Sequence, residues 1–242
     1  MKEILVHTRY RFLLLTILFF IGYLTIFVSA EETVFNVPSA DILEKGKLYL
    51  ETDQYIRPWK TDSSRAAFFL VRGVYGIGSN TEIGVNTGPF DYIYKNSPFI
   101  DATLKWRPFL REYNKGSLGF IVGDNAGIGL ENEISGHFRN FAYAAGIFGL
   151  TPTMTRITAG SYFATRDVFT SHKRFGAQIT FEQPIPNVKG LELAADWFSG
   201  DGAAMTTGVI WTVDRYVFYG GYGFANQGRK DDLLTLEMGI NF

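Results

Sequence analysis

The residues able to do chemistry in this 242-residue chain are charged side chains that recur at every second position of otherwise apolar segments. Glu51 and Asp53 form one such pair, and Lys105 and Arg107 form another. Side chains two residues apart on a β-strand point to the same face. A surface of mixed charge either lines a hydrophilic pore or fills a closed interior with ion pairs. The candidate pore-lining residues are Glu51, Asp53, Arg72, Glu82, Asp101, Lys105, Arg107, Arg156, Arg174, Glu192, Asp196 and Glu237.

Catalytic groups are scarce, because only His137 and His172 follow the first thirty residues. His172 follows Ser171, and Asp201 lies in a later polar connection, so the three residue types of a Ser-His-Asp catalytic triad are present. Their spacing carries no signature, and the motif Gly-x-Ser-x-Gly is absent. We therefore predict that the protein is not an enzyme.

The composition excludes several other classes. The chain has no Cys, which excludes disulfides, thiolate metal sites and a lipidated N-terminal Cys. Its 23 Lys+Arg and 24 Asp+Glu nearly cancel, whereas a nucleic-acid-binding surface needs a clustered basic excess. The glycines of Gly73 to Gly78 lie in a predicted strand and turn, unlike a nucleotide-binding loop before a helix. We predict no cofactor, no metal site and no nucleic-acid partner.

The first thirty residues have the pattern of a secretory signal peptide. Lys2, Arg9 and Arg11 precede an apolar stretch from Phe12 to Val28, and the small residues Ser29 and Ala30 follow it. An uncleaved membrane anchor is the alternative, because the apolar stretch is long for a signal. We predict a signal peptide at 1–30, a periplasmic lead-in at 31–46 and one β-domain at 47–242.

From Lys47 onward, apolar and polar residues alternate in segments of about ten, the length of a tilted membrane-spanning strand. In the last segment, Leu234, Leu236, Met238, Ile240 and Phe242 alternate with Thr235, Glu237, Gly239 and Asn241. About twelve such segments follow one another, an even number as in single-chain bacterial barrels. They begin near Lys47, Ala66, Thr81, Phe99, Ser117, Arg139, Thr155, Lys173, Leu191, Ala204, Tyr216 and Asp232.

Short connections such as 78–80 and 214–215 alternate with longer, more polar ones such as 57–65 and 88–98, as in a transmembrane barrel. A soluble sandwich or lipocalin-like barrel would also use short alternating strands. Aromatic residues near the strand ends favour the membrane barrel, because such girdles lie at membrane interfaces. Glycines on the polar face suit a crowded lumen; they are Gly84, Gly119, Gly160, Gly176, Gly208 and Gly220.

Residues 234–242, Leu-Thr-Leu-Glu-Met-Gly-Ile-Asn-Phe, resemble the terminal strand of bacterial outer-membrane β-barrel proteins, which ends in an aromatic residue. The segment Val37 to Gly46 resembles a lead-in found before the first strand of uncharacterised members. The resemblance implies an outer-membrane location, lipid as the surrounding medium, and recognition of Phe242 by the barrel assembly machinery.

These observations predict an all-β protein, a closed antiparallel transmembrane β-barrel with an up-and-down meander. Charged residues inside it favour a narrow passive channel for small hydrophilic solutes, with the candidate residues as its lining. The alternatives are a closed barrel that acts through its outer loops and an outer-membrane hydrolase. The sequence assigns neither a solute nor an oligomeric state.

Overall fold

The structure, a computed structural model, describes residues 33–59, 67–91, 98–130, 136–151, 153–166, 168, 174–200 and 203–242. The predicted signal peptide at 1–30 lies outside the described residues, as do Ser171, His172 and Asp201. Within the described ranges, no helix is long and apolar enough to cross a membrane.

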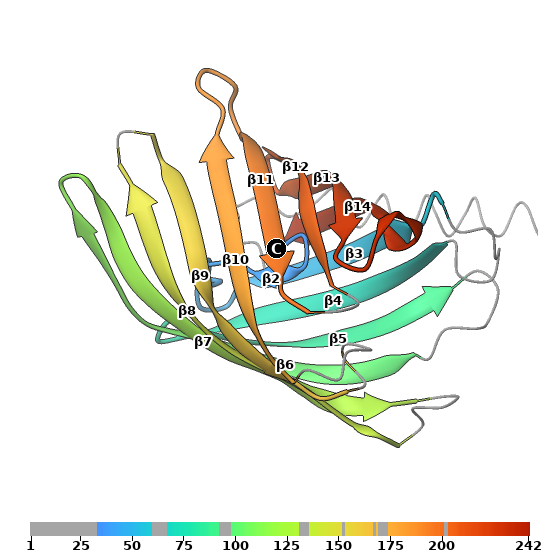
Figure 1. The fold of residues 1–242 in the computed structure, drawn as a ribbon. Coiled ribbons are helices and arrows are strands. Elements are labelled where there is room, and N and C mark those ends of the chain that lie inside the picture. The colour runs from blue at the N-terminus through green and yellow to red at the C-terminus, as the bar shows by residue number, and fades with distance from the viewer. Residues whose placement is uncertain are drawn as a thin grey trace, which may run out of the picture.

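The fold is a closed antiparallel barrel of twelve strands, in which each strand pairs with its neighbours in sequence (Figure 1). The last strand pairs with the first through Glu237 opposite Asp53, which closes the barrel. The strands are β3 (Leu48–Ile56), β4 (Ala67–Gly78), β5 (Thr81–Asp91), β6 (Phe99–Tyr113), β7 (Gly116–Gly129), β8 (Phe138–Leu150), β9 (Thr155–Ala164), β10 (Phe175–Pro184), β11 (Leu191–Phe198), β12 (Ala204–Val213), β13 (Tyr216–Ala225) and β14 (Leu233–Asn241).

The predicted fold class and strand count are confirmed, and every strand begins within two residues of its predicted start. The short connections, such as Ser79-Asn80 and Asp214-Arg215, all lie at one end of the barrel, which we call the turn end. Ser79, Asn80 and Asp214 have positive φ angles, as the tight turns of hairpins require. The opposite end carries the longer connections, and we call it the loop end.

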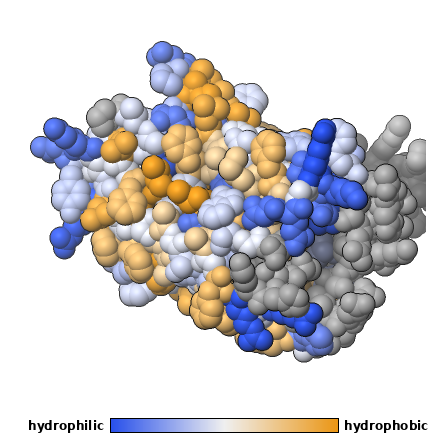
Figure 2. Space-filling model, in the orientation of Figure 1, coloured by the Kyte–Doolittle hydropathy of each residue, from blue (hydrophilic) through white to orange (hydrophobic). Residues whose placement is uncertain are grey.

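The wall of the barrel is apolar on its outside. Leu50, Leu104, Trp106, Leu236 and Met238 are each 41–52% exposed although they are large hydrophobic residues. Figure 2 shows hydrophobic side chains across the visible wall, with hydrophilic ones gathered toward the ends. Such an exterior suits hydrocarbon rather than water.

The inside of the barrel is less uniformly polar than the predicted alternation. Val74, Ile121, Ile147 and Ile210 face inward and are at most 1% exposed. Of the glycines predicted on the polar face, Gly220 instead faces outward, because Val217 and Tyr219 set the inward positions of β13. The inward apolar side chains belong to two buried clusters that also include residues from before the first barrel strand.

Candidate functional site

Residues 33–46, which we call the N-terminal segment, lie inside the barrel. Their hairpin of β1 (Thr33–Val34) and β2 (Val37–Pro38) forms a two-stranded sheet separate from the barrel sheet. The segment contacts side chains from strands on opposite walls, among them β5 and β11. In Figure 1 it is the blue trace enclosed by β3, β10 and β11. The predicted division between a lead-in and the barrel at residue 46 is not tested by this placement.

Asp196 on β11 holds the middle of the N-terminal segment. Its Oδ2 accepts hydrogen bonds from the backbone N–H of Asn36 at 2.5 Å and of Val37 at 2.8 Å. The Asn36 side chain donates to Thr206 Oγ1 at 3.2 Å and accepts from the Tyr55 hydroxyl at 3.2 Å. One carboxylate oxygen of the barrel wall thus accepts from two consecutive backbone N–H groups of the segment.

Asp41 is joined to Arg156 on β9. The guanidinium donates to both carboxylate oxygens at 2.7 Å, and it also donates from Nε to Glu182 of β10 at 2.8 Å. Burial alone would raise the pKa of Asp41, but Arg156, aided by Lys105 and Arg107, outweighs it and holds that pKa below the ordinary value. Asp41 is therefore an ionised carboxylate inside the lumen at neutral pH.

Two further attachments lie nearer the turn end. The backbone N–H of Leu43 donates to Glu82 Oε2 at 2.7 Å, while Lys105 Nζ lies 2.7 Å from Glu82 Oε1. Arg107 donates to the Ala40 carbonyl at 3.1 Å. Glu82 and Arg107, predicted as pore-lining residues, thus bind the segment directly.

Apolar packing adds to these polar bonds. Val34 and Phe35 are fully buried, in one cluster with Tyr49 and Val74. Inward glycines make the room: a Cβ on Gly221 would lie 2.8 Å from the Phe35 ring, and one on Gly76 would lie 2.1 Å from the Glu44 carbonyl oxygen. The segment thus occupies the space beside these two glycines.

The seam between β14 and β3 holds three buried carboxylates, Glu51, Asp53 and Glu237, whose oxygens lie within 4.8 Å of one another. Arg72 is their counter-charge, with NH2 2.7 Å from Asp53 and Nε 3.5 Å from Glu51. Arg72 also donates to Thr33 Oγ1 at 3.0 Å. Carboxylate clusters can hold a cation, but here a guanidinium already lies against two of the three groups.

The interior also contains Arg139, a buried charged residue that is not among the predicted pore-lining residues. Arg139 on β8 is 6% exposed, and its Nε lies 3.4 Å from Asp101 Oδ1. Its guanidinium carbon lies 3.9 Å from the centre of the Phe99 ring. The signal was available, because Arg139 alternates with outward residues in the same way as Phe141 and Tyr143.

The remaining predicted residues have no direct contact with the N-terminal segment in the bonds described above. Glu192 is half-buried near the turn end, and Arg174 is exposed just before β10 at the loop end. Phe242 lies at the closing seam, where its N–H donates to the Leu48 carbonyl at 2.8 Å. The predicted roles of these three residues stay predictions.

Two cavities lie on either side of the N-terminal segment. One, of about 230 Å³, lies toward the loop end and includes Thr33 and Asn36 in its lining. The other, of about 320 Å³, lies toward the turn end and includes Asp41, Arg156, Glu182 and Glu192. The segment therefore lies between two hollow parts of the lumen.

The closed antiparallel barrel of twelve strands with an apolar exterior is the fold that the sequence predicted. No protein-family model matches the sequence, and a search of curated proteins finds no match either. The chain is similar to outer membrane phospholipase A from Escherichia coli, with 10% identity, 81% of this chain and 92% of that chain covered, and a TM-score of 0.46. It is also similar to an outer membrane channel from Pseudomonas putida F1, with 14% identity, 86% and 100% covered, and a TM-score of 0.49.

Proposed function

We propose that this barrel is a channel of the bacterial outer membrane for small hydrophilic solutes, and that its N-terminal segment closes the pore. The barrel would stand with its turn end in the periplasm, as short turns do in such proteins. Lipid surrounds its apolar wall, and the assembly machinery reads the terminal strand at Phe242. Release of the segment opens a path lined by the candidate charged residues.

The observation that carries the proposal is that the segment forms a sheet of its own, without backbone pairing of β1 or β2 to any described barrel strand. It is attached mainly by side chains of the wall, among them Asp196, Arg156 and Glu82. Those attachments can break while the hydrogen-bond ladders of the barrel stay intact. A plug built into the barrel sheet could not leave without opening the sheet.

A closed barrel is the second candidate, and the burial of the central charges favours it. Asp53, Glu82 and Lys105 are each at most 4% exposed, and each lies in an ion pair of 2.7 Å. Such a filling would stabilise a barrel that never conducts. The two candidates differ in whether removing one attachment of the segment produces a conducting pore.

Planar-bilayer recording of the purified full chain and of Asp196→Ala separates them. The alanine removes the acceptor of two segment N–H groups, so the channel predicts rare discrete openings in the unaltered protein and frequent openings in the variant. Asp214→Ala, at an exposed turn, is the matched control and keeps the unaltered pattern. Silence of all three folded proteins would show a closed barrel.

A further inference from the structure

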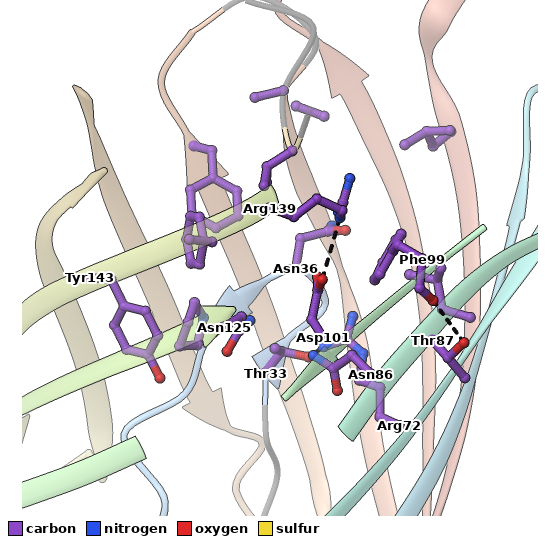
Figure 3. A pocket seen from close by; sticks show the side chains of 18 residues that line it. Thr33, Asn36, Arg72, Asn86, Thr87, Phe99, Asp101, Asn125, Arg139 and Tyr143 are labelled. Atoms are coloured by element: carbon purple, nitrogen blue, oxygen red, sulfur yellow. Dashed lines mark hydrogen bonds and ion pairs between the residues drawn. The ribbon is translucent and has the colours of Figure 1, made fainter. Parts of the chain in front are cut away.

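The cavity on the loop side of the N-terminal segment is lined by both aromatic and polar side chains. Phe141, Tyr143 and Phe198 supply the rings, with ring centres 5.5 Å apart for Phe141 and Phe198 and 5.7 Å apart for Phe141 and Tyr143. Asn86 lies opposite Asp101 in the β5–β6 ladder, whereas Asn125 lies opposite Phe141 in the β7–β8 ladder and so adjoins the rings (Figure 3). The cavity is therefore amphipathic, because rings and polar side chains both line it.

The size of the cavity suits a single six-membered ring. Its volume is about 230 Å³, whereas a buried apolar cavity of about 150 Å³ already binds benzene. More than half of the residues that line it are apolar. Binding pockets for small molecules share this composition, with a few polar groups that fix the orientation of the ligand.

The charges of the cavity favour a neutral ligand over an anion. Arg139 lies 3.4 Å from Asp101, and Arg72 lies 2.7 Å from Asp53, so each guanidinium already faces a carboxylate. An additional anion would compete with these carboxylates and leave them without a counter-charge in a buried place. A neutral ligand leaves both ion pairs intact.

The polar side chains of the cavity favour a ligand with a hydroxyl group. The Asn86 Oδ1 atom is buried and has no hydrogen-bond partner among the described residues, and such an acceptor is costly to leave without a donor. The amide of Asn125 also lines the cavity. A hydroxyl both donates and accepts, so it can serve either orientation of an amide.

We propose that the loop-side cavity binds a small neutral ring compound that carries a hydroxyl group, a monocyclic phenol being the simplest example. The ring lies against Phe141 and Phe198, and the hydroxyl donates to Asn86. Binding of such a compound requires only the cavity. That the compound is also a solute of the channel rests on the proposed function. Thr33 and Asn36 form part of the lining, so the bound ring contacts the segment that closes the pore.

Calorimetric titration of the folded full chain in lipid nanodiscs tests the proposal with phenol, benzoate and glucose as probes. Empty nanodiscs give the background from partition into lipid. Phenol is expected to bind at least tenfold more tightly than benzoate, which adds a charge, and than glucose, which lacks an apolar ring. Equal binding of the three probes, or no phenol binding above the background, would overturn the proposal.

Two variants place the binding in the cavity. Ala204→Phe fills the cavity from β12, and Asn86→Leu removes its acceptor; each is expected to weaken phenol binding at least tenfold. Ala102→Phe is the matched control, because Ala102 faces the membrane side of β6 and is exposed. Phenol binding that survives Ala204→Phe unchanged would contradict the site. The titration measures binding and not transport, so a negative titration would not contradict the proposed channel. Absence of openings in the bilayer recording would likewise not contradict the binding site.

Discussion

The carboxylate of Asp41 and the guanidinium of Arg156 form two parallel hydrogen bonds of 2.7 Å across 115 residues of sequence. Asp41 belongs to the N-terminal segment, whereas Arg156 belongs to the barrel wall. The bidentate geometry is the strongest kind of side-chain pair between these groups. It ties the candidate gate to one of the residues predicted to line the pore.

Asp41→Asn should loosen the N-terminal segment. The amide keeps the shape of the side chain but replaces one acceptor with a donor that faces the guanidinium, so one of the two hydrogen bonds is lost. We expect the ratio of open to closed channels to rise about tenfold, which corresponds to about 1.4 kcal/mol. Single-channel recording measures this ratio. An unchanged ratio would show that the pair does not hold the gate.

The contribution of Asp41 should depend on pH in a defined direction. Its folded-state pKa lies below its ordinary value, because Arg156, with Lys105 and Arg107 nearby, outweighs the effect of burial. Its stabilising effect is therefore complete above the ordinary pKa of about 4 and is lost as the pH falls through the lower folded value. Glu182 also contacts Arg156, so only the difference from a matched variant isolates Asp41.

The measurement compares the unaltered protein with Asp41→Asn from pH 7 to pH 2. The readout is the rate at which a dipyridyl disulfide labels Asn36→Cys, introduced in both proteins because the chain has no other Cys; the protonated pyridine of this reagent lets it react with thiols in acid. We expect the variant to label faster at pH 7 and both proteins to converge at the acid end. A difference that grows as the pH falls from 7 to 5 would contradict the depressed pKa.

Adjacent glycines on β13 give a matched pair of tests for packing of the segment. A Cβ on Gly221 would lie 2.8 Å from the Phe35 ring, whereas a Cβ on Gly220 meets no atom within 4 Å. Gly221→Val should therefore displace Phe35 and increase the open fraction of the channel, and Gly220→Val should leave it unchanged. Equal behaviour of the two variants in bilayer recording would argue against a segment seated on this strand.

The carboxylates at the closing seam should differ in their effect on stability. Asp53→Asn removes the charge that lies 2.7 Å from Arg72, and breaking a buried pair typically costs about 3–5 kcal/mol. Glu237 has no hydrogen-bond partner among the described residues and faces two other carboxylates, so Glu237→Gln should not lower stability. Urea unfolding in lipid vesicles compares the two variants. A larger loss for Glu237→Gln would refute this assignment of the seam.

The sequence predicted the barrel well because its signal is local. Each strand repeats every two residues, and a break such as Asp214-Arg215 marks a turn without any long-range information. An exposed apolar wall on one side and a charged lumen on the other keep that pattern clear along each strand. The starts of the strands could be predicted for the same reason.

The contents of the lumen could not be predicted in the same way. The N-terminal segment lacks a long alternating pattern, and its partners, such as Asp196 and Arg156, lie more than 100 residues away in sequence. Inward residues such as Ile121 look like lipid-facing ones until the strand register is known. The sequence therefore predicted charged residues inside the barrel but not the segment that binds them.

The most direct test of the central claim fixes the N-terminal segment to the wall and then releases it. Asn36 and Thr206 are in side-chain contact at 3.2 Å, so the double variant Asn36→Cys, Thr206→Cys can form a disulfide in a chain that has no other Cys. If the segment closes the pore, the oxidised protein shows no openings in a planar bilayer, and a reductant restores openings in the same membrane. Conduction by the fully oxidised protein, equal to that after reduction, would contradict the claim that this segment closes the pore.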